Sequence, residues 1–349
     1  MRLGNTAHVR VATQIAFAAL IAVGALQPPV AQSANAGINT QDAQAHELWR
    51  RAMSDNLPAT EGCAQAAYPS LVWERVACTV VAPPVIPVTR ASTSVAGVPN
   101  TVGNRHDWVL GARGLLTQAI GVFLNVKNVK SEKDVGVASF GGGGLHGANE
   151  YSLQLNSNQN DTTSVCAGHS GCTVWQQYLY TTDTPKKGNA AVFIQYWLLN
   201  WGKTACPKGF FNANGSCVMN SAGAIAPNMK ITQLGSLQLE AKATPGGNDG
   251  VLFSNGSKIY SVTTKDSVLK IGTVWTQAEF NVVGNGGGSK AVFNTGASLD
   301  VVIKIADGST LAPGCLRNAG STGETNNFFL GGCITAGGAN PAMEFFEGN

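Results

Sequence analysis

The sequence predicts an all-β protein: an antiparallel β-sandwich of the jelly-roll or concanavalin type with a small, partly helical N-terminal segment. From residue 150 onward, short segments alternate apolar and polar residues, and turn signals recur about every ten residues. Almost no helical periodicity interrupts them. Glycine supplies 42 of the 349 residues, against about 7% in typical proteins, as expected for a chain with many turns. Together these observations favour an all-β fold over a mixed one.

The composition excludes some classes of protein. Only 12% of the residues are charged, where about 25% is usual. The formal net charge is +3, and no basic run is present. Because nucleic-acid binding depends on clustered Lys and Arg, we do not expect a nucleic-acid partner. The hydrophobic fraction of 44% is large enough to form a core.

The first 36 residues have the pattern of a signal peptide. Arg2 and Arg10 precede an apolar stretch at 11–26, and Ala34-Asn35-Ala36 is an A-x-A cleavage site. The alternative is a retained membrane anchor, for which the apolar stretch is short. We therefore expect a secreted or periplasmic protein, a monomer without a membrane span in its mature form.

Eight cysteines suit a framework of four disulfides in an oxidising compartment. The sequence alone leaves their connectivity open, although the spacing favours bonds between neighbours. These neighbours are Cys63 with Cys78, Cys166 with Cys172, Cys206 with Cys217, and Cys315 with Cys333. No C-x-x-C motif occurs and no His has zinc-finger spacing from a Cys pair, so we expect no metal and no cofactor.

Residues 37–147 differ in composition from the rest and are expected to form an N-terminal segment or pro-region. The expected elements are a helix over 42–53, an extended Pro-rich linker at 82–90, an amphipathic helix over 107–124 and a flexible joint at Gly141–Gly144. A boundary near residue 148 would then separate this segment from a β-sandwich domain over 148–349.

The expected strands of that domain follow from period-two alternation and aromatic or β-branched content. They cover residues 151–155, 173–180, 190–199, 237–241, 250–263, 273–283, 298–305, 328–330 and 343–346. Asn255-Gly256 divides 250–263 into a hairpin with a type I′ turn. Gly286–Gly288 is not followed by a Lys-Ser/Thr pair, so a hairpin or bulge is favoured over a phosphate loop.

One face of the expected strand 273–283 carries an aromatic, an amide, a carboxylate and a second amide. These side chains are Trp275, Gln277, Glu279 and Asn281. This order is suitable for binding a polar ligand. The alternative is a solvated outer face, which is how one side of an antiparallel sheet commonly looks.

Two further strands place glutamines beside large aromatics. Trp175 and Gln177 share one face of the strand 173–180, and Gln176 lies on the other. Gln195 and Trp197 share a face of the strand 190–199. If these amides are buried they need partners, either a ligand or, as the alternative, backbone and water.

Carboxylates within strand patterns are few: Glu240, Glu279, Asp300 and Glu344. Glu279 has the most suggestive neighbours, so it is the candidate catalytic carboxylate. No G-x-S-x-G elbow supports a serine hydrolase, and oxidised cysteines provide no thiol nucleophile.

Several segments resemble known families. GCAQAAYPSLVWERVAC (62–78), NEYSLQLNSN, CTVWQQYLY, VFIQYWLLNWG and AEFNVVGNGGGSKAVFN resemble a group of secreted bacterial proteins. VWQQYLY and FIQYW are also similar to two strands of neprosin, and AEFNVV is similar to a strand of the eqolisins. Both are glutamic endopeptidases.

This resemblance implies a β-sandwich made as a zymogen and active in acid, with a Glu that activates water beside a Gln or a second Glu. The chain departs from the pattern in three places. Thr173 stands where neprosin has an acidic residue, Val174 replaces a Gly, and Val283 replaces the second Glu of the eqolisin strand. Only Gln176 or Gln177 with Glu279 remains as a catalytic pair.

Two functions follow from these residues. In the first, a glutamic endopeptidase, Glu279 is the general base and a Gln amide stabilises the oxyanion, with 37–147 as pro-segment. In the second, a non-catalytic module binds a carbohydrate or peptide, which stacks on tryptophans and is oriented by amides. The residues of this binding surface would be Trp175, Trp197, Trp275, Gln195, Gln277 and Asn281. The sequence leaves the substrate open.

Overall fold

The computed structural model describes residues 34–82, 106–138 and 142–349. The chain comprises two compact units, residues 1–42 and 43–349. A helix, α1 (Ala34–Asp55), begins in the first unit and continues into the second. It includes the helix expected over 42–53. Residues 1–33 lie outside the described residues, so the signal peptide stays a prediction.

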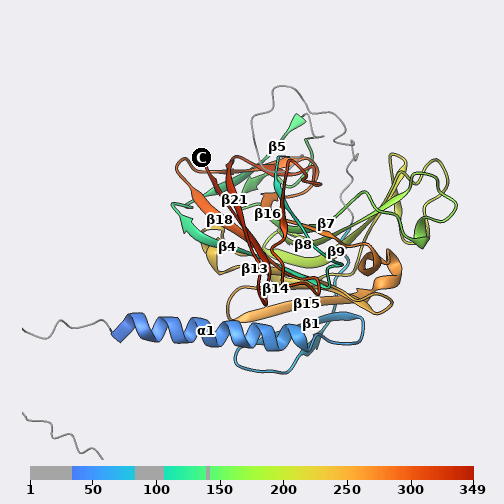
Figure 1. Ribbon diagram of the computed structural model, residues 1–349. Helices are drawn as coiled ribbons and strands as arrows, with labels where there is room; N and C mark the ends of the chain where they lie inside the picture. The colour runs from blue at the N-terminus through green and yellow to red at the C-terminus, as the bar shows by residue number, and fades with distance from the viewer. Residues whose placement is uncertain (1–33, 83–105, 139–141) are drawn as a thin grey trace, which may run out of the picture. The chain divides into compact units, whose positions relative to one another are not determined.

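In the part of the chain that the structure describes, most strands belong to two nine-stranded sheets (Figure 1). The first sheet has the order β2 (Glu74–Val76), β1 (Gly62–Ala67), β15 (Lys258–Lys265), β14 (Asn248–Ser254), β13 (Gln238–Ala243), β4 (Gln118–Lys127), β18 (Ser298–Ala306), β22 (Ala342–Gly348) and β21 (Phe329–Ala336).

The second sheet has the order β10 (Phe211–Ala213), β11 (Ser216–Asn220), β9 (Asn189–Leu199), β8 (Thr173–Thr182), β7 (Tyr151–Ser157), β16 (Gln277–Gly284), β3 (Trp108–Gly111) and β19 (Gly314–Arg317), and β12 (Ala224–Pro227) also pairs with β9. A small sheet has the order β20 (Thr325–Asn326), β17 (Ser289–Phe293), β5 (Glu132–Gly136) and β6 (Gly147–Ala148). Short 3-10 helices are Ser164–Cys166, Ile231–Ser236, Asp266–Val268 and Ile271–Thr273.

The first and second sheets enclose the main hydrophobic core. Alternate residues of β8 point into it, and Tyr180 stacks on Phe253 of the first sheet with ring centroids 3.9 Å apart. Phe280 packs against Phe123 of the first sheet in a tilted arrangement, with ring centroids 4.9 Å apart. The odd-numbered side chains of β8, such as Gln177, therefore face away from the first sheet. The predicted all-β antiparallel sandwich is confirmed.

The hairpin β14–β15 forms where Asn255-Gly256 predicted it, but its turn differs from type I′. The Asn255 N–H donates to the Lys258 carbonyl at 3.2 Å, so Gly256 and Ser257 are the central residues. Gly256 has φ +96°, whereas Asn255 and Ser257 are not among the positive-φ residues. A positive φ at the first central position alone is typical of type II′. The Asn255 side chain accepts the Lys258 N–H instead of occupying the turn centre.

Residues 107–124 do not form the expected helix. They form β3 and the larger part of β4, and β4 lies between β13 and β18 in the middle of the first sheet. The reason is that Ala119, Gly121 and Phe123 alternate with half-buried residues, so that a period of two fits this stretch better than a helical period. The boundary near 148 is therefore wrong, because residues 37–147 supply sandwich strands. Residues 83–90 of the linker and Gly141 lie outside the described residues.

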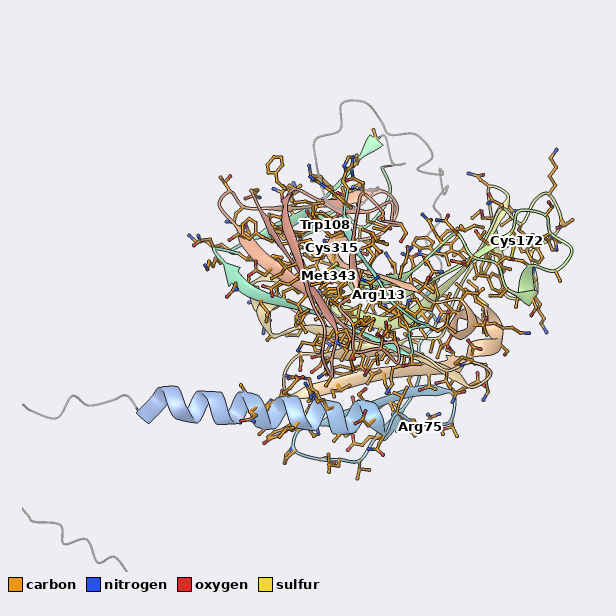
Figure 2. The ribbon with its side chains drawn as sticks, in the orientation of Figure 1. Arg75, Trp108, Arg113, Cys172, Cys315 and Met343 are labelled. Atoms are coloured by element: carbon orange, nitrogen blue, oxygen red, sulfur yellow. A yellow bond between two sulfur atoms is a disulfide. The ribbon has the colours of Figure 1, made fainter. Side chains whose placement is uncertain are left out.

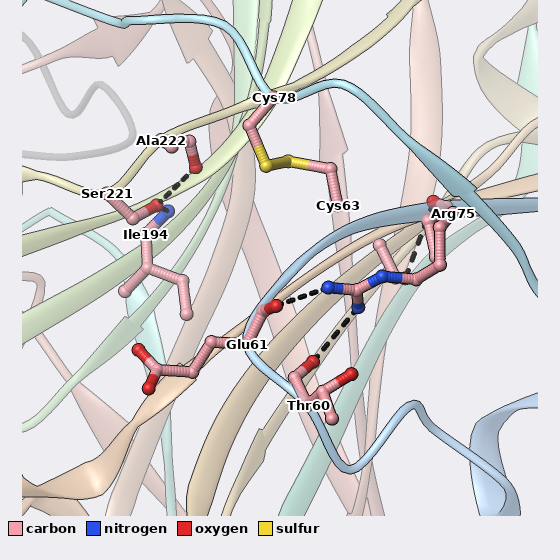
Figure 3. Close-up of a disulfide and its surroundings, with 10 residues drawn as sticks. Thr60, Glu61, Cys63, Arg75, Cys78, Ile194, Ser221 and Ala222 are labelled. Atoms are coloured by element: carbon pink, nitrogen blue, oxygen red, sulfur yellow. Dashed lines mark hydrogen bonds between the residues drawn. A yellow bond between two sulfur atoms is a disulfide. The ribbon is translucent and has the colours of Figure 1, made fainter.

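The four disulfides join the neighbouring cysteines, as the spacing favoured. They are Cys63–Cys78, Cys166–Cys172, Cys206–Cys217 and Cys315–Cys333. Cys315–Cys333 joins β19 to β21 and so links the edges of the two large sheets; Figure 2 shows Cys315 close to Trp108, on the paired strands β19 and β3. Beside Cys63–Cys78, Arg75 donates to the carbonyls of Thr60 and Glu61 (Figure 3). Four disulfides indicate folding in an oxidising compartment.

Gly286–Gly288 connect β16 to β17, which belong to different sheets, so this turn is neither a hairpin nor a phosphate loop. Within the described ranges, no helix has the length and apolar character needed to cross a membrane.

Candidate functional site

Five polar side chains lie side by side across the second sheet. The strand register pairs Glu279 with Asn156, Asn156 with Gln177, Gln177 with Gln195, and Gln195 with Asn220. Directly paired residues of antiparallel strands point to the same face, here the face away from the first sheet. We call these five residues the amide row. The sequence predicted its two glutamines and Glu279, and the register brings them together.

Hydrogen bonds join the members of the amide row into one network. Asn156 Nδ2 donates to Glu279 Oε2 at 3.3 Å, and Gln177 Nε2 donates to Asn156 Oδ1 at 3.1 Å. Trp197 Nε1 donates to the Oε1 atoms of Gln177 (3.0 Å) and Gln195 (2.8 Å). Gln195 Nε2 then donates to Asn220 Oδ1 at 2.8 Å. The amides therefore satisfy one another, and the buried glutamines carry little desolvation penalty.

Two tryptophans lie beside the row. Trp175 and Trp197 are stacked, with ring centroids 6.0 Å apart, and both are buried. Trp175 Nε1 is a buried donor without a hydrogen-bond partner within the described residues. A buried indole N–H normally finds an acceptor, so this atom is suited to a ligand's oxygen.

Trp275 was expected on the same surface, and this prediction is wrong. It precedes β16 and is fully buried in the core, 5.7 Å from the Tyr178 ring. The chain turns here, with the Trp275 N–H donating to the Ile271 carbonyl, and the indole N–H donates to the Gln277 carbonyl at 2.8 Å. The turn breaks the strand alternation that placed Trp275 next to Gln277. The Gln277 side chain is half-buried on β16, one position along the face from Glu279.

Gln176 was considered as a partner of Glu279, and this is also wrong. It points into the core, where its Nε2 donates to Tyr178 Oη and Asp249 Oδ2, both at 2.9 Å. Successive residues of a strand face opposite ways, so only one of Gln176 and Gln177 can lie on the face of Glu279.

Only one carboxylate oxygen of Glu279, Oε2, accepts hydrogen bonds from the described residues. Its side chain is 3% exposed. Oε2 accepts hydrogen bonds from the Ser321 N–H (2.8 Å), Ser321 Oγ (2.5 Å) and Asn156 Nδ2. Oε1 is buried and has no partner among the described residues. The carboxylate is thus fixed in orientation while the lone pairs of Oε1 stay available.

The amide beside Glu279 is Asn156, not a glutamine. Gln177 reaches Glu279 only through Asn156, because β7 lies between β8 and β16. The alternation of β7 was visible in the sequence, but its pairing with β16 was not. Ser321 comes from a loop, and no sequence signal pointed to it.

Further carboxyl groups lie close to Glu279. Asn281 Nδ2 donates to Glu347 Oε1 at 2.9 Å and to Asp107 Oδ2 at 3.4 Å. Both carboxyls are fully buried. The sequence reasoning missed them, since Asp107 was assigned to a helix and Glu347 to the chain end. Asn281, expected to touch a ligand, instead bridges these two acids.

Burial and mutual repulsion raise the pKa values of these carboxyl groups. Burial raises the pKa of Glu279, and the hydrogen bonds from Ser321 and Asn156 partly oppose it. Burial and the charges of Glu279 and Glu347 raise the pKa of Asp107 well above its usual value. Burial raises the pKa of Glu347 to about 8. Perturbed carboxyls in one place are typical of functional sites.

The chain was also compared with known proteins. No protein-family model matches it, and no curated protein and no solved structure is significantly similar to it. Across the described residues, no group of three or more His, Cys, Asp or Glu is placed to hold a metal ion. The function must therefore be argued from the site itself.

Proposed function

We propose that the protein is a secreted, glutamic-peptidase-like hydrolase in which Glu279 is the general base. One observation carries the proposal: three donors hold Oε2 of Glu279, while the buried Oε1 has no partner. A general base needs this arrangement, because its reactive oxygen must be oriented and free to accept a proton from water.

In the proposed reaction, a water bound at Oε1 loses a proton to Glu279 as its oxygen attacks the carbonyl carbon of a peptide bond. The carbonyl oxygen then carries negative charge and needs a donor. When this intermediate collapses, the C–N bond breaks and Glu279 returns the proton to the leaving amine. Asn156 Nδ2 has two hydrogens, and Glu279 takes one of them. The second hydrogen is available for the oxyanion.

Gln177 has the role of a positioning residue in this proposal. Both hydrogens of its Nε2 are used, by Gln154 Oε1 at 3.0 Å and by Asn156 Oδ1. Its Oε1 accepts from Trp197. Gln177 therefore fixes the amide plane of Asn156, so that the Asn156 N–H groups point toward Glu279.

Burial of the site favours a zymogen. Glu279, Asn156 and Gln177 are 1–3% exposed in the full chain, so a peptide substrate cannot reach them without a change. The Ala82 carbonyl accepts from Asn220 at one end of the amide row, and Asp107 lies near the other end, beside Asn281. Because β3 and β4 are strands of the two large sheets, removal of the whole expected pro-segment 37–147 is not part of the proposal. We propose instead that activation includes a cut in the Pro-rich stretch 82–90.

The test is hydrolysis of denatured casein at about pH 3 to 7, with the purified protein before and after incubation in acid. Glu279→Gln keeps the shape of the side chain and removes the base, so hydrolysis should be lost. Glu240→Gln, a buried Glu in the other large sheet, is the matched control and should keep it. Hydrolysis by folded Glu279→Gln would overturn the mechanism. Retention of a peptide or sugar without hydrolysis would instead support the binding module.

A further inference from the structure

Two glycine-rich turns are hydrogen-bonded to each other at the small sheet. The Gly143 N–H donates to the Gly287 carbonyl at 2.7 Å, and the Leu145 N–H donates to the Asn285 carbonyl at 3.2 Å. A Cβ at Gly144 would overlap the Gly286 carbonyl oxygen. The backbones thus approach as closely as only glycine permits. We call residues 142–145 with 285–288 the glycine clasp.

Buried carboxyl groups lie beside the glycine clasp. Glu132 and Asp134 come from β5, and Glu150 precedes β7; their side chains are 3%, 0% and 9% exposed. Asn285 connects the clasp to them, because its N–H donates to Asp134 Oδ1 (3.3 Å) and its Nδ2 donates to Glu150 Oε2 (3.2 Å).

Glu132 and Asp134 have few of the partners that buried carboxylates need. Within the described ranges, both oxygens of Glu132 and Oδ2 of Asp134 are buried without a hydrogen bond of ordinary geometry. The Glu150 N–H and the Ser289 hydroxyl lower the pKa values of Glu132 and Asp134, but less than burial raises them. A buried carboxylate without donors or a cation is costly, whereas a neutral carboxylic acid is tolerated. The closed arrangement therefore suits the protonated acids.

The charged groups that act on the cluster are mostly acidic. Asp183 shares a hydrogen bond with Glu150, and Glu324 raises the pKa of Asp134 by its charge. His146, whose Nε2 lies 2.9 Å from the Gly143 carbonyl oxygen, acts on Asp134 in the opposite direction. His146 is exposed to solvent and directly follows residues 142–145 of the clasp.

We propose that the small sheet is a pH-sensitive latch: the glycine clasp is closed in acid, and ionisation of Glu132, Asp134 and Glu150 opens it. Ionised acids need water, and separation of the two glycine turns, which are joined by backbone hydrogen bonds, would admit it.

The pH range follows from burial of the three acids. Burial raises the pKa of Asp134 to about 7, that of Glu150 to about 8 and that of Glu132 to about 9. The folded, closed state therefore retains its protons up to neutral pH. Opening should begin near pH 7 with Asp134 and be complete above the pKa of Glu132.

The latch is connected to the amide row. β20 pairs with β17 in the small sheet, and the segment just before β20 carries Ser321, which holds Glu279. Asn326 Nδ2 also donates to the Val282 carbonyl of β16 at 3.0 Å. Opening should thus loosen the hold of Ser321 on Glu279; this link alone rests on the proposed function.

Hydrogen exchange followed by mass spectrometry tests the latch on the full chain without an activity assay. Exchange is compared at about pH 4.5 and 8.5 and corrected for the intrinsic rate at each pH. We expect peptides that cover residues 132–138, 142–149 and 284–293 to lose protection by about tenfold or more at the higher pH. Peptides from β13 and β14 serve as the internal reference.

Substitutions decide whether the acids cause the loss of protection. Asp134→Asn with Glu132→Gln removes two ionisable groups and should keep these peptides protected at both pH values. Glu240→Gln, the matched control, should show the same pH-dependent loss of protection in these peptides as the parent chain. If the double variant does not fold, Glu150→Gln alone should raise the pH at which protection is lost. Equal protection at both pH values in the parent, or loss that these variants leave unchanged, would overturn the latch. Loss of protection with unchanged casein hydrolysis would overturn only its link to Glu279.

Discussion

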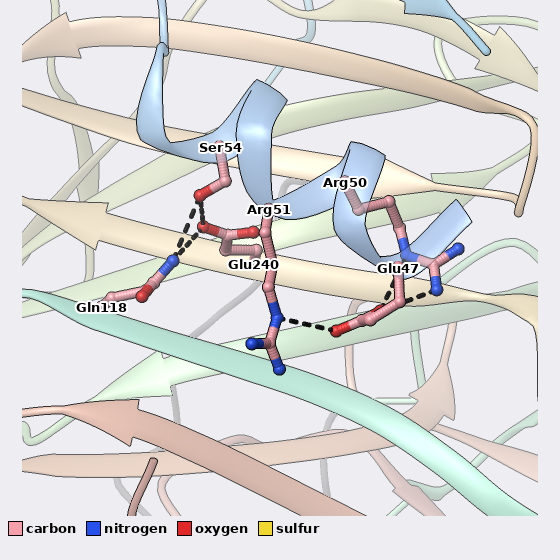
Figure 4. A network of polar contacts seen from close by, with 6 residues as sticks. All are labelled: Glu47, Arg50, Arg51, Ser54, Gln118 and Glu240. Atoms are coloured by element: carbon pink, nitrogen blue, oxygen red, sulfur yellow. Dashed lines mark hydrogen bonds and ion pairs between the residues drawn. The ribbon is translucent and has the colours of Figure 1, made fainter. Parts of the chain in front are cut away.

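Glu279 and Glu240 are buried glutamates, one in each large sheet of the sandwich, and their surroundings differ. Each is 3% exposed and lies within a strand, on the face away from the other sheet. Oε1 of Glu240 accepts from Ser54 Oγ of α1 and from Gln118 Nε2 (Figure 4). Glu279 has Ser321 and Asn156 in equivalent roles.

The difference lies in the charges around each group. Burial raises the pKa of Glu240, and the hydrogen bonds from Ser54 and Gln118 and the positive charge of Lys242 partly oppose this effect. A cavity of about 210 Å³ beside Glu240 is lined by residues of both charges: Arg50, Arg51, Lys304, Glu47 and Asp55. Glu47 pairs with both arginines. Glu279 instead has the carboxyl of Glu324 acting on it and raises the pKa of Asp107 in turn. The comparison teaches that burial alone does not mark a functional carboxyl. A buried carboxyl near cations anchors structure, whereas a buried carboxyl among other acids stays reactive.

The largest expected effect is on hydrolysis. Glu279→Gln should lower kcat/KM by about 10²–10⁴, the usual contribution of a general base. Glu240→Gln should leave it within about threefold, because that side chain fixes α1 and touches no substrate. Both variants are assayed against casein after acid activation. Equal losses of kcat/KM in the two would contradict the proposed difference between Glu279 and Glu240.

Stability should fall as the pH rises. In the unfolded chain carboxyls lose their protons near the ordinary values of 3.8 for Asp and 4.5 for Glu, but in the folded chain Asp134 keeps its proton to about 7, Asp249 to about 8 and Glu132 to about 9. The folded state binds more protons between these limits, so the free energy of unfolding decreases with pH across this range.

The expected decrease between pH 4 and pH 9 is on the order of a few kcal/mol. Urea denaturation at several pH values, followed by tryptophan fluorescence, measures it. A free energy of unfolding that is highest near pH 8 would contradict the raised pKa values.

The two buried glutamates should differ in the sign of their effect on stability. Glu279→Gln removes a group that ionises unfavourably in the fold, so at pH 7 it should leave the free energy of unfolding unchanged or raise it. Glu240→Gln removes the carboxylate that accepts from Ser54 Oγ and Gln118 Nε2, and it should lower the free energy by about 1–3 kcal/mol. Denaturation midpoints of both variants at pH 7 test this, and a loss of equal size in the two would refute the distinction.

The smallest expected effect comes from Ser321. Its hydroxyl lowers the pKa of Glu279 by donating to the carboxylate. Ser321→Ala should therefore raise the pH of half-maximal hydrolysis by about one unit, at little cost in the rate at the optimum. Ser54→Ala, the equivalent change beside Glu240, is the control and should not move the profile.

A part of the fold or of the site could be predicted from the sequence only where the residues that determine it lie close together in the chain. The alternation of residues 173–180 and 190–199, the hairpin at Asn255-Gly256 and the pairing of neighbouring cysteines are all carried by residues close in the chain, and the structure confirms them. The helix predicted over residues 107–124 was wrong. The apolar positions of this stretch fit a helix as well as two strands, and only pairing with other strands decides for β3 and β4.

The sequence by itself determined the all-β class and the placement of Glu279 opposite the apolar face of its strand, and the cysteine spacing favoured the disulfide pairs without fixing them. Only the tertiary structure decided that Gln177 and not Gln176 shares that face with Glu279, and that Trp275 belongs to the core. It also placed Asn156, Ser321 and Asp107 around Glu279, from strands and a loop far apart in the chain. Strand order and register set these contacts, and they depend on the packing of the whole sandwich, which no local pattern of residues encodes.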